Sequence, residues 1–252
     1  MSYPSSNPIG QPLTILLSVD STNNYAMAQA QNGQATHGAA WLAMEQTAGK
    51  GQRGKNWVAS YGENILFSVL LTPPPNHISH PFLLSATIAL GCYDFFNIYA
   101  GDETSIKWPN DLYWRDRKAV GILLENSYRG KDWVFTVAGM GININQTRFH
   151  EGAKNPVSLR QITGGEYDVT TVVPELCKTL ENRYQQLLQD KTGSILKDYQ
   201  SVLYKRGQTV KLKKDNSIFE TTIIGVTASG SLITHDTIDR SFEVGEVEWL
   251  IN

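Results

Sequence analysis

The chain has 252 residues, of which 41% are hydrophobic and 18% are charged, and its formal net charge is −2. This length accommodates one catalytic domain with a small appended domain, and the composition excludes a disordered or fibrous protein. The net charge argues against a broad basic surface for nucleic acid. Cys92 and Cys177 have no metal-ligand spacing, so we expect a reduced, cytoplasmic protein.

The first predicted elements are a strand over 13–19 and a helix that begins at Asp20, Ser21, Thr22 and Asn23. Each of these four side chains can cap the first turn of a helix, which is the ordinary role of such a tetrad. The alternative is that amide and hydroxyl groups at a helix start face a ligand with polar ring atoms. The residues alone leave both roles open.

A strand over 39–45 leads into the loop 46–57, in which three glycines alternate with three cations. The glycines let the backbone approach a ligand closely, and the cations attract phosphate. The loop does not end as a Walker loop does, and its glycine spacing excludes a dinucleotide-binding fingerprint. An anion-binding loop and an ordinary basic surface loop both fit this pattern.

A buried strand is predicted over 64–71, followed by a helix over 79–97 with apolar residues at helical spacing. The longest apolar stretch of the chain, 82–96, falls within that helix. Four small or polar residues interrupt it, so we expect a core helix and not a membrane span.

The most informative segment is 107–125. Lys107 ends a strand, because the Trp-Pro that follows it cannot continue a sheet ladder. A turn at 110–111 and a strand over 112–114 come next, and a third strand over 119–125 is apolar enough to be buried on both faces. Lys107 is therefore expected at the lip of a sheet, among aromatic and amide groups, with little role in packing.

A further buried strand is predicted over 133–139, and the glycines that follow it indicate a close backbone approach. Helices are predicted over 158–162, 170–190 and 193–203. After Gly207 the pattern changes to five short strands, 209–212, 218–224, 232–234, 240–243 and 247–251, which predict a small SH3-like barrel. We therefore divide the chain into a catalytic domain, 1–204, and a barrel domain, 205–252.

Four separated motifs resemble those of the biotin protein ligases, in that family's order and over nearly all of residues 13–252. They are the Ser-Thr-Asn helix start, the Gly-rich basic loop ending in Trp57, the Lys-Trp-Pro-Asn-Asp block with the strand Arg-Lys-Ala-Val-Gly-Ile-Leu-Leu-Glu after it, and Gly-Met-Gly-Ile-Asn. The resemblance implies an α+β fold, with helices packed on a mixed central β-sheet like that of class II aminoacyl-tRNA synthetases, plus the small C-terminal barrel. It implies the monofunctional type without an N-terminal DNA-binding domain, because only about a dozen residues precede the first strand.

The resemblance also implies ATP-dependent activation of biotin to biotinyl-5′-AMP and transfer of biotin to a lysine of a biotin carboxyl carrier domain. On the matching positions, Lys107 and Arg53 are the expected catalytic residues. The expected biotin contacts are Ser21, Thr22, Asn23, Gln46, Gly49, Lys50, Gly51, Gln52, Lys107 and Gly121. The expected contacts of ATP and the adenylate are Arg53, Lys55, Trp57, Lys107, Asn110 and Asn143.

The ligands implied by the resemblance are biotin, ATP and Mg²⁺, with no metal-binding residues in the chain. The implied partner is the carrier protein or carrier domain of a biotin-dependent carboxylase. We expect a monomer or homodimer, with no nucleic acid and no membrane as partner.

The loop departs from the family pattern at two positions. Lys50 and Gln52 stand where the family usually has arginines, so two guanidinium groups capable of bidentate phosphate contact are missing. We expect the adenylate to be held less tightly as a result.

Three other functions compete with biotin ligation. An octanoyltransferase requires a nucleophilic cysteine paired with a lysine, whereas Cys92 and Cys177 fall in predicted helices. A lipoate-type acyl-protein ligase of the same superfamily and a non-catalytic adenylate-binding protein remain as alternatives.

Overall fold

The computed structural model describes residues 7–73, 80–189 and 193–250. The first part of the chain contains β1 (Leu13–Leu16), α1 (Thr22–Gln31), β2 (Ala40–Ala43), the 3-10 turn η1 (Gln52–Gly54), β3 (Asn64–Leu71) and α2 (Pro81–Ala100). The middle contains β4 (Thr104–Lys107), β5 (Asp111–Trp114), β6 (Arg117–Arg129), β7 (Asp132–Asn143), α3 (Leu159–Thr163), α4 (Val169–Gln189) and α5 (Ser194–Ser201). The last part contains β8 (Thr209–Lys214), β9 (Ser217–Val226), β10 (Leu232–His235), β11 (Asp239–Phe242) and β12 (Glu248–Leu250).

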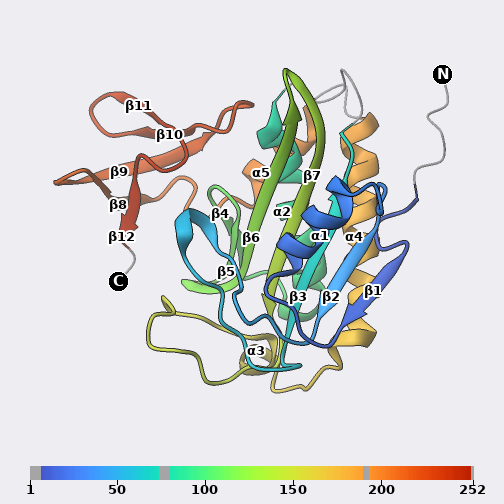
Figure 1. Cartoon of the computed structure of the whole chain (residues 1–252). Helices are drawn as coiled ribbons and strands as arrows, with labels where there is room; N and C mark the ends of the chain where they lie inside the picture. The colour runs from blue at the N-terminus through green and yellow to red at the C-terminus, as the bar shows by residue number, and fades with distance from the viewer. Residues whose placement is uncertain (1–6, 74–79, 190–192, 251–252) are drawn as a thin grey trace.

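The centre of the molecule is a seven-stranded sheet with the order β1-β2-β3-β7-β6-β5-β4. It is mixed, because β1 pairs with β2 in parallel while the other strand pairs are antiparallel. A second sheet of five antiparallel strands, in the order β11-β10-β9-β8-β12, lies to one side of it (Figure 1).

The predicted α+β class is confirmed, and each predicted helix and strand is present, β3 with the predicted bounds and the others at shifted bounds. The predicted helix start at residue 79, helix end at residue 190 and strand end at residue 251 lie outside the described residues. The division between 204 and 205 stays a prediction.

Side chains alternate between the two faces of the central sheet. One face packs against α2, α4 and α5 and forms the main core, to which Leu42, Phe67 and Ile142 contribute. The opposite face carries Trp41 and Leu70, which pack with residues of α1. Figure 1 shows α1 in front of the sheet with α2 and α4 behind it. Because α1 packs on β2, β3 and β7, the part of this face formed by β4, β5 and β6 is left for other segments.

The helix α2 is long and apolar enough to cross a membrane by length and composition alone. Its residues Ile88, Phe95 and Phe96 are fully buried in the main core, as expected for the core helix predicted from the sequence. Gly91 allows α4 to pack closely, because a Cβ there would lie 2.7 Å from Leu180 Cδ2.

One prediction about the central segment is wrong. The strand over 119–125 was expected to be buried on both faces, but in β6 only the face with Val120 and Ile122 is buried. Gly121, Leu123 and Glu125 alternate with them and are partly exposed. The strand has one core face and one open face, and its sequence looks uniformly apolar because Gly121 and Leu123 stand on the open face.

Replacing Gly91 with alanine is expected to lower the free energy of unfolding by about 1–2 kcal/mol, although alanine gains about 1 kcal/mol of helix propensity over glycine. The added methyl group would also lie 2.9 Å from Leu180 Cα, and a backbone atom cannot move aside as a side-chain end can. Chemical denaturation of Gly91→Ala measures the change.

The same substitution in a Leu180→Ala background provides the control. It should cost less there, because the side-chain atoms of Leu180 that crowd the methyl group are gone. Equal costs in both backgrounds would show that the Leu180 side chain is not an obstacle and that only its backbone opposes the methyl group.

Candidate active site

The predicted site residues gather on the open face of the central sheet. The strand register places Ser68 of β3 beside Gly139 of β7, and Gly141 of β7 beside Gly121 of β6. Alternation puts Glu125 of β6 on the same face. The three glycines give this face a stretch of bare backbone, against which side chains from other segments lie.

At one end of the face is a hydrogen-bonded polar cluster, formed by Thr22, Asn23, Gln46, Ser68 and Glu125. The backbone N–H and the hydroxyl of Thr22 donate to Gln46 Oε1 over 2.8 and 3.1 Å. Asn23 Nδ2 donates to Glu125 Oε2 over 2.8 Å. Ser68 Oγ lies 2.7 Å from Thr22 Oγ1 and 2.6 Å from Asn23 Oδ1, and its single hydrogen serves one of them at a time.

The side chains of Thr22 and Asn23 at the start of α1 therefore form hydrogen bonds with residues of the sheet and do not cap the helix. Ser21 is the N-cap residue, yet its side chain makes no capping hydrogen bond. Ser21, Thr22 and Asn23 are all buried. Asn23 reaches the sheet because Gly139 has no Cβ, which would collide with the Asn23 amide.

Sequence reasoning missed Ser68 and the role of Glu125 in this polar cluster. The signal for Ser68 was a hydroxyl in the middle of an apolar, fully buried strand, where it is costly unless it is hydrogen-bonded. Glu125 ends the apolar run of the central segment, and in the structure its carboxylate also lies 3.6 Å from Lys50 Nζ.

The loop 46–57 lies across β6 and is fixed there by a second set of hydrogen bonds. Gln52 Nε2 donates to Asn110 Oδ1 over 2.6 Å and to the Ile122 carbonyl over 3.3 Å. Asn110 Nδ2 donates to the same carbonyl over 3.0 Å. Gln52, which stands where the family usually has arginine, thus ties the loop to the sheet.

Within the loop, Gly49 and Gly51 permit close pairing of its two halves. The Trp57 N–H donates to the Gly49 carbonyl over 2.8 Å, and the Gly51 N–H donates to the Lys55 carbonyl over 2.6 Å. A Cβ at Gly49 would collide with the Trp57 carbonyl. The pairing places Trp57 over the sheet.

The Trp57 ring rests on the bare backbone of Gly121 and Gly141. A Cβ at Gly121 would lie 2.6 Å from the ring, and one at Gly141 would lie closer still. The ammonium of Lys118 lies 5.9 Å from the ring centre. The indole N–H is buried and has no hydrogen-bond partner among the described residues.

At the other end of the face is Lys107, whose expected lack of a packing role is wrong. Its ammonium lies 5.3 Å from the ring centres of both Tyr113 and Trp249. Burial away from water lowers the pKa of Lys107 to about 8, and the Asp111 carboxylate opposes that decrease. Lys118 adds to the decrease, because a second positive charge disfavours the ammonium.

Three further cations surround Lys107, and their charges also act on it: Lys118, Lys154 and Lys55. A bulge between β5 and β6 pairs Lys118 with Tyr113, and the extra residue turns Lys118 toward the open face. Lys118 Nζ lies 2.7 Å from Asp111 Oδ2. Two carboxylates, Asp111 and Glu248, stand against these four lysines, and Glu248 pairs with Lys154 over 2.9 Å. The excess of positive charge leaves this end of the face suited to bind an anion.

Two predicted nucleotide contacts make other contacts in this structure. Arg53 is exposed, and its guanidinium lies against Gly245, between β11 and β12. Asn143 is buried and donates to the Val157 carbonyl over 3.1 Å. Their roles toward a nucleotide stay predictions.

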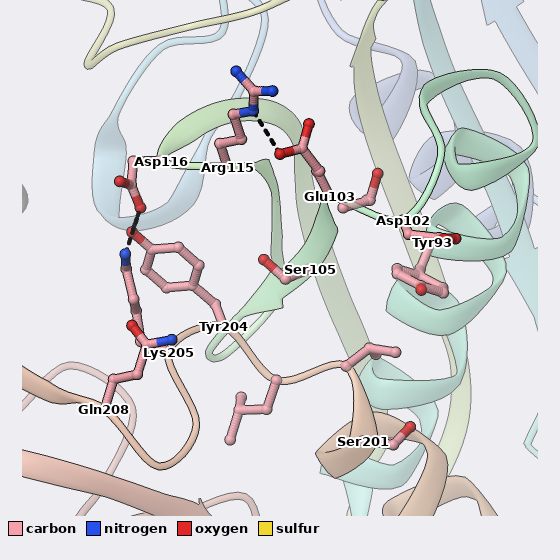
Figure 2. A pocket seen from close by; sticks show the side chains of 13 residues that line it. Tyr93, Asp102, Glu103, Ser105, Arg115, Asp116, Ser201, Tyr204, Lys205 and Gln208 are labelled. Atoms are coloured by element: carbon pink, nitrogen blue, oxygen red, sulfur yellow. Dashed lines mark hydrogen bonds and ion pairs between the residues drawn. The ribbon is translucent and has the colours of Figure 1, made fainter.

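A separate groove of about 560 Å³ lies along β4 and the segment 201–208 (Figure 2). It is lined by none of the predicted site residues. Four of its five charged side chains form ion pairs, since Asp116 pairs with Lys205 over 2.8 Å and Arg115 with Glu103 over the same distance. The open face of the central sheet is the better candidate for the active site.

Residues 16–143, just over half of the chain, match the model of the Biotin/lipoate A/B protein ligase family. The chain belongs to this family. The matched region contains every predicted site residue of the ligase and ends before the five-stranded sheet begins.

Similar proteins and structures carry the name of biotin ligases. The chain is 29% identical over 245 residues to the bifunctional ligase/repressor BirA of Escherichia coli, a match that covers 94% of this chain and 74% of that protein. It is 35% identical over 161 residues to the biotin–[acetyl-CoA-carboxylase] ligase of Paracoccus denitrificans, covering 61% and 65% of the two chains. The biotin protein ligase of Aquifex aeolicus in complex with biotin and ATP superposes with a TM-score of 0.79 at 25% identity, covering 95% of this chain and 99% of that one.

Replacing Gly141 with alanine is expected to lift the Trp57 ring from the sheet and to free the loop. The added Cβ would lie 2.3 Å from Trp57 Cε2, while the strand backbone below it is held in the sheet and cannot move away. Hydrogen exchange of the backbone amides of 46–57 should increase. Gly152→Ala is the control, because its Cβ would meet only the exposed side chain of His150; equal exchange in the two variants would contradict the proposed packing.

Proposed function

We propose that this protein activates biotin with ATP and transfers it to a lysine of a biotin carboxyl carrier domain. The observation that carries the proposal is that one face of the sheet has a hydrogen-bonding end, whose carboxylate Glu125 lies near Lys50, and a cationic end, with the Trp57 ring packed on the sheet between them. Biotin has the matching halves, a neutral polar ring system and a carboxylate. The names of the similar proteins support the choice of biotin.

The polar cluster suits the neutral half. A ureido group has one carbonyl acceptor and two N–H donors, so its site needs both donors and acceptors. Thr22 and Ser68 supply hydroxyl groups, and Asn23 supplies an amide with both functions. These side chains are buried and hydrogen-bonded to one another. They are therefore already fixed, and ligand binding would cost little side-chain conformational entropy.

The cationic end suits the first chemical step. An oxygen of the biotin carboxylate attacks the α-phosphorus of ATP, the bond to the β-phosphate oxygen breaks, and pyrophosphate leaves with biotinyl-5′-AMP formed. Two anions must meet in this step, and fixed cations lower the cost of bringing them together. Lys107, Lys118, Lys154 and Lys55 are the cations on this side of the face, and Lys154 is paired with Glu248.

In the second step, the neutral amine of the carrier lysine attacks the acyl carbon of the adenylate. The bond from that carbon to the phosphate oxygen breaks, AMP leaves, and the amine loses a proton as the amide forms. The mixed anhydride must be kept from water until the carrier arrives. The loop 46–57 lies over the site with Trp57 packed on Gly121 and Gly141, and we assign it that protective role.

Mg²⁺ is proposed to enter with the phosphates of ATP. No group of three His, Cys, Asp or Glu side chains among the described residues could hold a metal ion. Mg²⁺ commonly binds substrate phosphates together with only one or two carboxylates, so this side-chain arrangement fits a metal ion that is carried by the nucleotide.

A covalent thiol intermediate, as in octanoyl transfer, is not favoured. Cys92 is fully buried in α2, and burial raises the pKa of its thiol. Burial also raises the pKa of Cys177 to about 11. Neither thiol forms a nucleophilic thiolate near neutral pH. The cytoplasmic location, the oligomeric state and the absence of nucleic acid or membrane partners stay predictions.

Incubation of the protein with biotin, Mg-ATP and a biotin-acceptor domain should add the mass of one biotinyl group to the acceptor. Lys107→Met should lower adenylate formation by about 10²–10³-fold, because it removes the central cation while keeping a long apolar chain. Lys178→Met on the exposed side of α4 is the matched control and should act as the parent. Pyrophosphate release at the parent rate from folded Lys107→Met would contradict the role of Lys107, and transfer of lipoate but not biotin would contradict the substrate.

The rate of adenylate formation should also depend on pH through Lys107. The anions are held by the ammonium form, and a lysine with a pKa of about 8 loses its charge as the pH rises through 8, whereas an ordinary lysine with a pKa of 10.5 keeps it. Because kcat/KM reports the free enzyme, it should fall above about pH 8. A constant kcat/KM up to about pH 10 would contradict this account.

A further inference from the structure

The five-stranded sheet contacts the candidate active site through the segment 245–249. Gly245 lies against the guanidinium of Arg53. The Glu248 carboxylate is 2.9 Å from Lys154 Nζ, and Trp249 covers the ammonium of Lys107. These contacts join the second sheet to cations of the central sheet's open face and the segments around it.

The contact between Trp249 and Lys107 is part of an aromatic clamp, which we define as the rings of Tyr113 and Trp249. Both ring centres lie 5.3 Å from Lys107 Nζ. Tyr113 belongs to β5 and Trp249 to β12, so the two rings come from different sheets. The pairing of Trp249 with Leu212 of β8 fixes its position in the second sheet.

A third aromatic residue holds the two rings of the clamp together. Tyr204, in the segment between α5 and β8, packs against Tyr113 with ring centres 5.3 Å apart and against Trp249 with ring centres 5.8 Å apart. Its backbone N–H donates to the Ile106 carbonyl over 2.9 Å, next to Lys107. The clamp is therefore anchored beside the lysine that it holds.

The clamp stabilises the ammonium form of Lys107, which the neighbouring lysines destabilise. Lys118 on β6, Lys154 in the segment after β7 and Lys55 in the loop all repel its ammonium, and Asp111 on β5 is the carboxylate that attracts it. Asp111 is itself paired with Lys118. Aromatic ring faces attract a cation without adding a negative charge that would repel an anionic substrate.

We propose that Trp249 is a positioning residue for the ligation reaction, which holds the Lys107 ammonium over the open face through its ring. The proposal rests on the proposed function, and it makes the five-stranded sheet one wall of the active site. Trp249 acts through Lys107 and takes no part in bond making. The indole N–H is buried without a partner among the described residues, so its ring and not its N–H carries this role in the empty protein.

Three variants separate the clamp from simple packing. Trp249→Leu removes the ring, and kcat/KM for adenylate formation should fall by about tenfold. Trp249→Phe keeps a ring and should stay within about threefold of the parent. Phe219→Leu is the matched control, because Phe219 packs in the second sheet on Phe242 and Arg240 and is not one of the two rings that lie over Lys107. Its activity should match the parent after correction for the folded fraction.

A graded series tests the ring itself, without a change of shape. Site-specific replacement of Trp249 by tryptophans with one, two and three fluorine atoms weakens the attraction of the ring for a cation at nearly constant burial. The pKa of Lys107, measured by the pH dependence of its labelling with an amine reagent and mass spectrometry, should fall stepwise along the series. The kcat/KM for adenylate formation at a fixed pH near neutral should fall with it.

The outcomes distinguish the clamp from the proposed function. Labelling of Lys107 needs no turnover, so a stepwise fall in its pKa supports the clamp whatever acyl group the protein activates. A series with constant pKa and activity, or a Trp249→Leu variant as active as Phe219→Leu, would overturn the positioning role. A parent protein that does not adenylate biotin would overturn the proposed function and leave the labelling result in force.

Discussion

The active face of this protein depends on one constraint, the absence of side chains at three neighbouring positions of the central sheet. Gly139 allows the Asn23 amide to lie directly on the strand, and Gly121 and Gly141 do the same for the Trp57 ring. A single methyl group at any of them would collide with the side chain above it. The glycines thereby bring the start of α1 and the end of the basic loop onto adjacent strands, with the polar cluster at one end of the face and a set of cations at the other.

The two ends of the open face would bind a ligand through different interactions, hydrogen bonds at one end and charges at the other. Among the buried hydroxyl and amide groups at the Asn23 end, Ser68 Oγ can donate to Thr22 or to Asn23, so this part of the polar cluster can adapt to a neutral ligand without a net charge. At the Lys107 end the lysines repel one another and are held by Asp111, Glu248 and the rings of Tyr113 and Trp249. An entering anion relieves this repulsion, so the same charges that strain the empty site favour the filled one.

The helices, strands and local motifs could be predicted well from the sequence, because each depends on residues that are close together along the chain. The strand β3 has the predicted bounds, and the five short C-terminal strands are all present. Prediction failed where the partner of a residue lies far along the chain. A run of apolar residues fits a strand that is buried on both faces as well as it fits β6, which has one core face and one face under the loop 46–57. The residues near Lys107 in sequence likewise give no sign that Trp249 lies over its ammonium. Ser68 and Glu125 were missed for the same reason, since their roles exist only when α1 lies over the sheet.

The central claim is that one ligand spans the open face from the polar cluster to the lysines. A crystal structure with a non-hydrolysable analogue of biotinyl-5′-AMP tests it most directly. We expect the ureido ring against Thr22, Asn23 and Ser68, the phosphate within reach of Lys107, and the Trp57 ring still on its glycines. An analogue bound elsewhere, such as in the groove beside Lys205 and Asp116, or bound with its phosphate at the Asn23 end, would contradict the account.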